Sequence, residues 1–309
     1  MEINLIDFYS RLGTIAIILI LGFCLGHFKL ISAHTNRDLV NLLLTIFMPA
    51  SLFMAFPTNY NESTSELFFS GLFAGVIVMV ALIILSRIIF SKGLYKGELR
   101  FESQFALIFN NATFLGYPII SSTFGEQGII PYCGFIIAFN VALFSYGVYL
   151  FERKLSKKLF TGIITNPNII AVALGVIVFM AGIHLPRFIT DAVSFTGNAT
   201  TALSVICIGV MLSHADFKGL IKKWRLMLTA AIQLIVGPLV TYFLLSFLRF
   251  PVEVITVCTL IQALPTATSL GLFAAKYGGN DIEASELVTV STIMSIVTMP
   301  IMVWVLLIH

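Results

Sequence analysis

Uncharged polar side chains gather in two short stretches of an otherwise apolar chain. Residues 109–120 read FNNATFLGYPII, and residues 262–271 read QALPTATSLG. Carboxamide and hydroxyl groups can hydrogen-bond a carboxylate without carrying a charge themselves. We therefore predict a binding site for a small organic anion, with no catalytic residue, metal ligand or cofactor. The predicted site residues are Asn110, Asn111, Thr113, Gly116, Pro118, Asn140, Asn198, Gln262, Pro265, Thr266, Thr268 and Ser269.

The same stretches contain residues that interrupt a helix. Pro118 and Pro265 each lack a backbone N–H and crowd the preceding turn, and Gly116 and Gly271 lower the cost of bending. Backbone groups freed by a break cannot face lipid, so the broken segments must face protein or a water-filled cavity. Two broken helices that cross there direct the N-terminal ends of their half-helices at one point. Each such end carries roughly half a positive charge, so the point attracts an anion without lysine or arginine.

Each of these residues also has a purely structural interpretation. The paired asparagines can link helices by hydrogen bonds, and the two prolines can be ordinary kinks. The hydroxyl groups can return hydrogen bonds to freed backbone groups. Asn140 and Gln262 fit packing and function equally well, and Asn198 lies in TGNATT, whose small residues suit close helix packing. Polar groups inside a membrane lean towards function, and Asn111 is the strongest candidate.

The composition is that of an integral membrane protein. Hydrophobic residues make up 58% of the 309 residues and charged residues only 11%, whereas a soluble domain carries about 25% charged residues. The basic residues fall in short clusters between apolar runs, so we expect no nucleic-acid partner. The four cysteines lie inside apolar stretches without ligand spacing, and we expect them to be buried and free.

Apolar runs long enough to cross a bilayer occur ten times along the chain. A helix needs roughly 20 apolar residues to cross the hydrocarbon core, and only short connections separate the runs. The predicted transmembrane helices are Gly13–Leu30, Leu39–Phe56, Leu67–Ile89, Gln104–Phe124, Ile129–Leu150, Pro167–Leu185, Ala192–Ser213, Met227–Leu248, Val252–Ala275 and Leu287–Ile308.

Positively charged residues fall in alternate connections. The first, third, fifth, seventh and ninth connections, together with the helix ends beside them, contain all of the 18 lysines and arginines except Arg11, Arg187 and Arg249. Because cytoplasmic loops carry the excess of lysine and arginine, we expect these connections in the cytoplasm and both termini outside it. We also expect the basic clusters to contact lipid headgroups.

The two polar stretches repeat one another. Residues 112–116 read ATFLG and residues 267–271 read ATSLG, and each lies in the fourth of five predicted helices in its half. An odd number of helices per half inverts the second half in the membrane. Inverted repeats with interrupted helices in corresponding positions are typical of secondary transporters with a site near the midplane. The predicted fold is therefore all-α, with ten transmembrane helices in two inverted five-helix repeats.

The order and spacing of several motifs resemble the auxin efflux carrier family. The motifs are NATFLGYPII followed by FGEQGI, NPNIIAVALG at 166–175, and QALPTATSLGLFAAKYGGN followed by STIMSIVTMP. That family includes plant auxin exporters and bacterial malate and malonate permeases, and the resemblance covers nearly the whole chain. The long cytoplasmic loop of plant members is absent, which favours a bacterial permease of the cytoplasmic membrane over an auxin carrier.

The resemblance implies a fold like that of the bile-acid and sodium–proton transporters, in which the fourth and ninth helices are broken and cross. It implies a scaffold and homodimer surface in residues 1–60 and 159–215. It also implies a transport domain, residues 61–158 and 216–309, that moves like an elevator. Substrates of the family are small organic anions held at the crossing, and Asn111, Pro118 and Pro265 match the family pattern.

Other functions fit the sequence less well. A membrane hydrolase needs a nucleophile and base, or a metal motif such as H-E-x-x-H, and the sequence lacks both, so we expect no enzyme. A passive anion channel and a receptor that does not transport are the alternatives to a carrier. Acids are missing from the centres of the predicted helices, which argues against a side-chain proton relay. Sodium held by neutral oxygens, co-transport of a protonated acid and uncoupled movement stay open, and we favour the last two.

Overall fold

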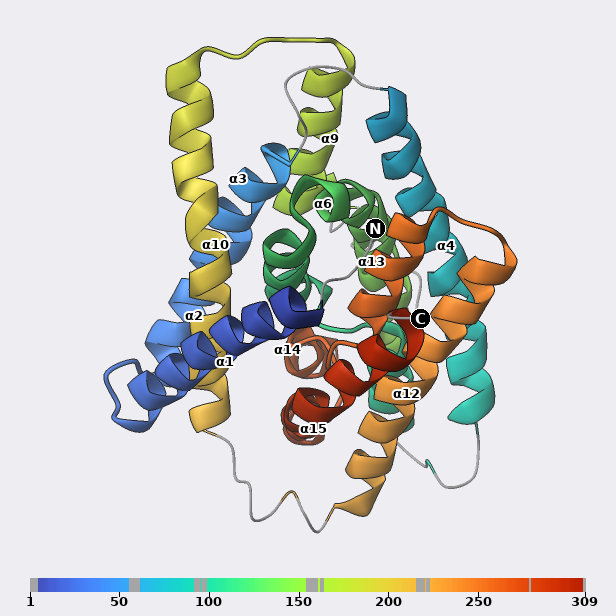
Figure 1. Ribbon diagram of the computed structural model, residues 1–309. Helices are drawn as coiled ribbons and strands as arrows, with labels where there is room; N and C mark the ends of the chain where they lie inside the picture. Colours follow the sequence, from blue (N-terminus) through green and yellow to red (C-terminus); the bar gives the residue numbers. More distant parts are fainter. Residues whose placement is uncertain are drawn as a thin grey trace.

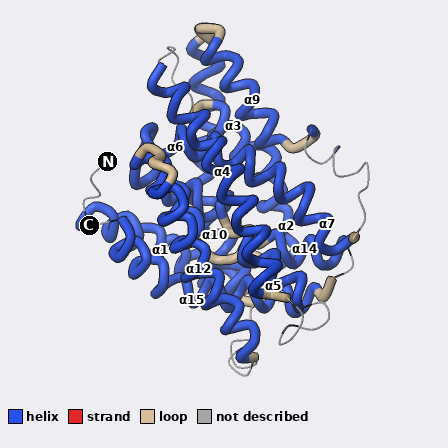
Figure 2. The backbone as a smooth tube through the Cα atoms, turned by 90° about the vertical axis from the view of Figure 1, so that its right-hand side faces the viewer, coloured by secondary structure: helices blue, strands red, loops and turns tan. Residues whose placement is uncertain are grey.

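The computed structural model describes residues 5–55, 62–91, 95, 99–153, 161, 164–214, 220, 223–277 and 279–307. Helices make up nearly all of these residues, and Figure 2 shows helices and short loops without a strand in the described part. The all-α class predicted from the sequence is therefore confirmed.

The helices of the first half include three short π-helical segments. A π-turn closes an i→i+5 hydrogen bond and often marks a functional position in a helix. The elements are α1 (Leu5–His27), α2 (Ala33–Leu42), η1 (Leu43–Phe47), α3 (Met48–Phe53), α4 (Glu62–Ile89), α5 (Leu99–Ile108), η2 (Ala112–Gly116), α6 (Tyr117–Ala142), η3 (Leu143–Gly147) and α7 (Val148–Glu152).

The helices of the second half are regular α-helices in the described residues. They are α9 (Pro167–Met180), α10 (Arg187–Ser213), α12 (Trp224–Phe247), α13 (Val252–Gln262), α14 (Ser269–Tyr277) and α15 (Asp281–Leu307). Asn166 begins α9 as its N-cap, because its side-chain oxygen accepts from the N–H groups of Asn168 and Ile169. Pro167 follows at the first helical position, where its missing N–H costs nothing.

Each predicted transmembrane segment overlaps between one and three helical elements. By length and composition, five helices in the described part are long and apolar enough to cross a membrane: Glu62–Ile89, Gln127–Glu152, Arg187–Ser213, Trp224–Phe247 and Asp281–Leu306. Shorter apolar helices cover Gly13–His27, Pro167–Met180 and Val252–Gln262. The helix lengths thus agree with an integral membrane protein.

Gly125 divides α6 into two helices that meet at an angle. Its φ is 55° and its ψ is −140°, a conformation that a residue with a Cβ rarely adopts. The turn lies between the fourth and fifth predicted segments, where the sequence reads FGEQG. The longer part of α6 after Gly125 then continues through η3 into α7.

One face of α4 exposes a continuous apolar stripe. Phe73, Val80, Ile84 and Ile88 recur at helical spacing along this face, and Phe73 and Ile88 are 60% and 66% exposed. Soluble proteins rarely expose contiguous apolar surface of this kind. The stripe is therefore suited to contact with lipid acyl chains.

The helices pack in two groups (Figure 1). The first group contains α1, α2, α3, α9 and α10, and the second contains α4 to α7 and α12 to α15. Contacts between the groups run mainly through α6 and η2, which meet α1, α9 and α10. In Figure 1, α1, α2, α3 and α10 lie towards the left, and α4, α12 and α13 lie towards the right.

Reciprocal glycines let one helix pair of each group approach closely. A Cβ on Gly22 would overlap the carbonyl oxygen of Ile206 on α10, and a Cβ on Gly209 would overlap the carbonyl oxygen of Leu19 on α1. Gly71 of α4 lies against Pro131 of α6 in the same way. Small residues at membrane helix interfaces permit this backbone approach.

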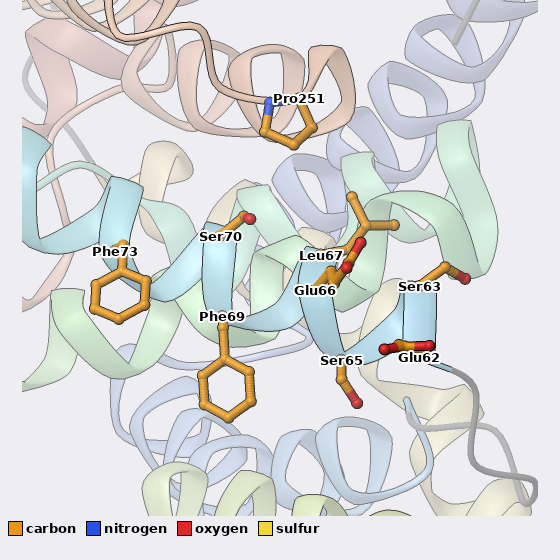
Figure 3. A pocket seen from close by; sticks show the side chains of 9 residues that line it. All are labelled: Glu62, Ser63, Ser65, Glu66, Leu67, Phe69, Ser70, Phe73 and Pro251. Atoms are coloured by element: carbon orange, nitrogen blue, oxygen red, sulfur yellow. The ribbon is translucent and has the colours of Figure 1, made fainter.

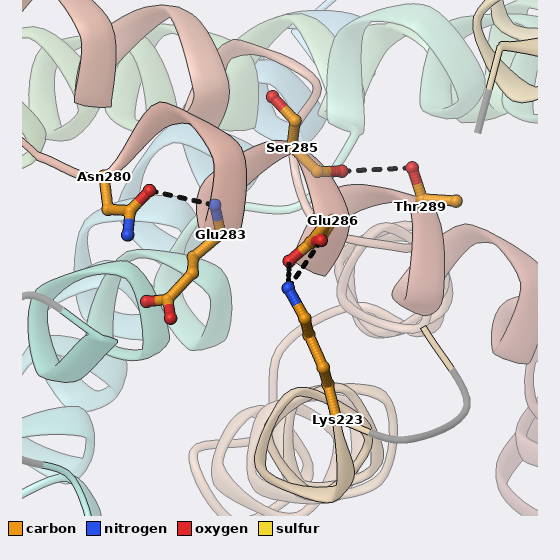
Figure 4. Close-up of polar contacts among 6 residues, drawn as sticks. All are labelled: Lys223, Asn280, Glu283, Ser285, Glu286 and Thr289. Carbon is orange, nitrogen blue, oxygen red and sulfur yellow. Dashed lines mark hydrogen bonds and ion pairs between the residues drawn. The ribbon is translucent and has the colours of Figure 1, made fainter. Parts of the chain in front are cut away.

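The first turns of α15 are fixed by polar contacts (Figure 4). The side-chain oxygen of Asn280 accepts from the N–H of Glu283 at 3.2 Å and so caps the helix. The ammonium group of Lys223, next to α12, lies 2.6 Å from both carboxylate oxygens of Glu286. These contacts join the starts of α12 and α15.

Candidate functional site

Both polar stretches interrupt their helices. Helix α5 ends at Ile108 and η2 begins at Ala112, so residues 109–111 form the first break. Helix α13 ends at Gln262 and α14 begins at Ser269, so residues 263–268 form the second break.

The two breaks pair with each other through their backbones. The N–H of Asn111 donates to the carbonyl oxygen of Pro265 at 2.6 Å, and the N–H of Ala267 donates to that of Phe109 at 2.9 Å. Asn110 and Thr266 lie opposite one another in an isolated antiparallel bridge. The breaks therefore cross and satisfy part of each other's freed backbone groups, as an apolar surrounding requires.

Neighbouring helices satisfy further backbone groups of the second break and of Ala112, which follows the first break. The hydroxyl of Ser291 on α15 accepts from the N–H of Thr266 at 3.1 Å. The amide of Gln233 on α12 donates to the carbonyl oxygen of Leu264 at 2.7 Å. The hydroxyl of Tyr132 on α6 donates to the carbonyl oxygen of Ala112 at 3.1 Å. Three helices thus hold the crossing in place through hydrogen bonds.

The side chains of the paired asparagines have different roles at the crossing. Asn111 is the N-cap of η2, because its Oδ1 accepts from the N–H of Phe114 at 3.2 Å. Asn110 donates from Nδ2 to Oε1 of Gln262 at 2.6 Å and so joins α13 to the first break. All three amides are buried, with at most 2% of each residue exposed.

Several buried polar atoms at the crossing have no hydrogen-bond partner among the described residues. An unsatisfied buried polar group costs about 1–3 kcal/mol, so native proteins contain few of them and each one calls for an explanation. A cluster of such groups marks a place where a polar ligand or water binds. The atoms are Asn110 Oδ1, Asn111 Nδ2, Gln233 Oε1, Thr259 Oγ1, Gln262 Nε2 and Thr266 Oγ1.

Comparison with known proteins agrees with the apolar helices of a membrane protein. A family model described as membrane transport protein matches residues 8–160 and residues 151–303. The chain belongs to this family, the auxin efflux carriers. A protein of Methanocaldococcus jannaschii named as an uncharacterized transporter is 22% identical over 305 residues, which are 95% of this chain and 97% of that protein. The chain is therefore a membrane transporter.

The transporter brings some of the predicted site residues to the crossing and leaves others apart. Asn140 is buried in α6, but its amide donates to its own helix at the carbonyl oxygen of Ile136, over 2.8 Å. Asn198 is exposed on α10, and none of the described hydrogen bonds joins it to a break. The residues at the breaks are Asn110, Asn111, Gln262, Pro265, Thr266 and Thr268, with Thr113 and Ser269 in the first turns that follow.

The first break lies before Pro118 and not at it. Pro118 stands in the first turn of α6, and the π-helical segment η2 separates it from Asn111. Pro265, in contrast, lies inside the second break. The sequence predicted that each proline interrupts its helix. This holds for Pro265, but Pro118 lies inside α6 and not at the first break. The reason is that Asn111 leaves the helical conformation by itself, with ψ at 52°, and restarts the chain as an N-cap.

The two glycines of the repeat serve close packing more than bending. Gly116 ends η2, and a Cβ there would lie 3.2 Å from Cδ1 of Leu264 in the second break. Gly271 lies inside α14, where a Cβ would come within 2.7 Å of the hydroxyl of Ser285 on α15. Gly116 therefore allows η2 to pack closely on the second break, and Gly271 allows α14 to pack closely on α15.

One buried acid of the transporter escaped the sequence analysis. Glu102 lies in the first turn of α5 and is 0% exposed. Its Oε1 accepts from the N–H of Asn280 at 3.0 Å, ahead of α15. The sequence correctly places this residue at a helix end, but nothing local distinguishes a buried helix end from an exposed one. Glu102 is the buried charged residue of the described chain, and it belongs to neither break.

Gln233, Thr259 and Ser291 are further residues at the crossing that the sequence analysis did not single out. Each is a polar side chain inside an apolar helix, and each is at most 1% exposed. Gln233 in particular stands near the middle of α12. The reasoning that selected Gln262 applies to it equally, because a buried amide in an apolar helix needs a partner.

An open pocket of about 660 Å³ lies elsewhere, at the start of α4 beside Pro251 (Figure 3). Its lining includes the carboxylates of Glu62 and Glu66 and the rings of Phe69 and Phe73. The two carboxylates repel an anion, and no residue of either break lines the pocket. The crossing is therefore the better candidate for the transport site.

Proposed function

We propose that this transporter moves a small organic anion, a mono- or dicarboxylate such as malate or malonate, across the cytoplasmic membrane. The observation that carries the proposal is the crossing of the two breaks. It gathers buried, uncharged hydrogen-bonding groups that have no partner among the described residues.

An anion fits the donors among these groups. The amide nitrogens Asn111 Nδ2 and Gln262 Nε2 are donors that a carboxylate can satisfy. The half-helices that begin at Ala112 and Ser269 both start at the crossing, and their N-terminal ends favour negative charge. Asn111, Asn110, Gln262, Thr266 and the other residues of the breaks would bind substrate as uncharged groups.

We propose an alternating-access mechanism of the elevator type for this transport. Residues 61–158 and 216–309 would form the moving domain, and residues 1–60 and 159–215 would form a scaffold and homodimer surface. The ten predicted helices would form two inverted repeats with both termini outside the cytoplasm. In support, the helices of each group contact mainly one another, and contacts between the groups are concentrated on α6 and η2.

Uptake into proteoliposomes tests the proposal. Purified protein is reconstituted, and the accumulation of radiolabelled malate and malonate is compared with that in empty liposomes. The variant Asn111→Ala is expected to lose most of the uptake. Asn36→Ala is the matched control, because Asn36 is also a buried amide, and it donates to the carbonyl oxygen of Cys207 on α10 and not to a residue of either break.

The same preparation separates the alternatives. Saturable uptake that is accelerated by substrate on the opposite side supports a carrier. Ionic current far above carrier turnover would indicate a passive anion channel, and binding without uptake would indicate a receptor. Absence of both binding and uptake for every small carboxylate, or full activity of Asn111→Ala, would contradict the proposed site.

A further inference from the structure

The amide of Gln233 has only one chemically sensible orientation. Its nitrogen lies 2.7 Å from the carbonyl oxygen of Leu264, and a carbonyl oxygen can only accept. The donor end of the amide must therefore face Leu264. As a result Oε1 points elsewhere, and this atom is a buried acceptor without a partner among the described residues.

The other amides of the crossing can be sorted in the same way. Asn111 must turn Oδ1 to the N–H of Phe114, so its unsatisfied atom is a donor. Asn110 and Gln262 bond each other, and in either arrangement of the pair one donor and one acceptor are left over. The crossing therefore offers unsatisfied acceptors as well as donors. A carboxylate, which only accepts, satisfies the donors and leaves the acceptors unmatched.

Gln233 belongs to the same cluster as the predicted site residues. Leu264, its partner, lies in the second break and next to Gly116 of η2. One turn further along α12, a Cβ on Gly237 would lie 3.7 Å from Oε1 of Gln262. The face of α12 that carries Gln233 and Gly237 thus packs against the amides of the crossing.

We propose that Gln233 is a specificity-determining residue of this transporter. Its Oε1 accepts a hydrogen bond from a hydroxyl on the transported carboxylate, so the transporter prefers hydroxy acids to the same acids without the hydroxyl. The carboxylate meets the amide donors, and the hydroxyl meets the acceptor on α12. This inference rests on the proposed function and narrows its substrate class.

Pairs of acids that differ by one hydroxyl test this preference. Binding of lactate against propionate and of malate against succinate is measured by calorimetry on the purified protein at pH 7, without sodium and with it. Both members of each pair have the same charge there, so the comparison isolates the hydroxyl. A buried acceptor left unsatisfied lowers affinity by roughly 5- to 100-fold, and we expect that preference for the hydroxy acids.

A variant assigns the preference to Gln233. Gln233→Met keeps the length of the side chain and removes the acceptor, and it is expected to bring the affinity ratio of each pair close to one. The control is Asn36→Leu, since Asn36 also donates to a backbone carbonyl and has an unsatisfied Oδ1, but lies between α2 and α10. This control is expected to keep the ratio. The ratio in the unaltered protein provides the test by itself if Gln233→Met does not fold.

The outcomes are distinct. Equal binding of hydroxy and unsubstituted acids overturns the role of Gln233 but leaves the proposed function standing. Binding that ignores the hydroxyl and requires sodium also overturns it, because the acceptors then serve a cation. If Gln233→Met still prefers the hydroxy acids, another group binds the substrate hydroxyl, and the role of Gln233 is overturned. Binding of none of the four acids contradicts the proposed function together with this inference.

Discussion

The backbone N–H of Asn111 donates to the carbonyl oxygen of Pro265 across 2.6 Å. This bond joins the two breaks, one from each half of the chain. The side-chain oxygen of Asn111 meanwhile caps η2 through the N–H of Phe114. Backbone N–H and side-chain oxygen are thus both fixed, and the amide nitrogen is left without a partner among the described residues, free for the proposed substrate. A binding group held in this way loses little conformational entropy when the ligand arrives.

Replacement of Asn111 separates its two roles. Serine caps a helix about as well as asparagine, whereas alanine at an N-cap costs about 1 kcal/mol. We expect Asn111→Ser to unfold near the temperature of the unaltered protein and Asn111→Ala to unfold at a lower one. Both variants lack the amide donor, so both are expected to lose carboxylate uptake by about tenfold, the effect of a hydrogen bond to a charged group. Thermal unfolding in detergent and proteoliposome uptake measure the two effects.

The corresponding changes at Asn36 are the control for this comparison. Asn36 is also buried and donates to a backbone carbonyl, that of Cys207 on α10, which belongs to neither break. Its replacement is expected to reduce stability and to leave uptake per folded molecule unchanged. If Asn111→Ser transports at the normal rate, the amide nitrogen of Asn111 is not a substrate ligand.

Thr266→Val is predicted to stabilise the protein while weakening transport. The hydroxyl of Thr266 is fully buried and has no partner among the described residues. Removing an unsatisfied polar group is neutral or favourable for folding, whereas loss of one ligand hydrogen bond of about 1 kcal/mol reduces affinity about fivefold. Thermal unfolding and the half-saturating concentration for uptake measure the two effects.

Thr241→Val provides the comparison for this change. Thr241 is equally buried on α12, but its hydroxyl donates to the carbonyl oxygen of Gly237 in its own helix. We expect Thr241→Val to leave the half-saturating concentration for uptake nearly unchanged. A drop in the unfolding temperature of Thr266→Val with normal uptake would show that the hydroxyl is structural.

The sequence was sufficient to locate the breaks but not their partners. Local chemistry marks FNNATFLGYPII and QALPTATSLG, because amides and prolines are costly in an apolar helix. Which backbone groups pair across the crossing depends on contacts between distant segments, so the bond from Asn111 to Pro265 could not be read from either stretch alone. The same holds for Gln233, whose significance comes from Leu264 lying against it.

The burial of the acidic residue Glu102 also could not be predicted from the sequence. Glu102 precedes an apolar run, as a solvated helix end would, and only the packing of α5 against the start of α15 shows that it is enclosed. For Pro118 the sequence predicted too much. The proline suggested a break at its own position, whereas the helix is interrupted earlier, at Asn111.

Glu102 is predicted to hold α5 to the start of α15. In Glu102→Ala the N–H of Asn280 loses its acceptor and a cavity forms, so we expect a loss of about 2 kcal/mol or more in the free energy of unfolding. Glu102→Gln keeps an oxygen that can accept, and its loss is expected to be smaller. Chemical unfolding in detergent measures both. Equal stability of Glu102→Ala and the unaltered protein would contradict this role.

The close packing of α4 on α6 is tested by Gly71→Ala, with Gly13→Ala in α1 as the control. A Cβ on Gly71 would overlap the backbone carbonyl of Pro131, which cannot move without displacing α6, so we expect Gly71→Ala to cost about 1–3 kcal/mol. Gly13 lies in α1 with nothing within 4 Å of its Cβ position, and Gly13→Ala is expected to be neutral or stabilising by up to about 1 kcal/mol. Thermal unfolding of both variants in the same detergent measures the difference. Equal unfolding temperatures would contradict the prediction that the close approach of Gly71 to Pro131 contributes to stability.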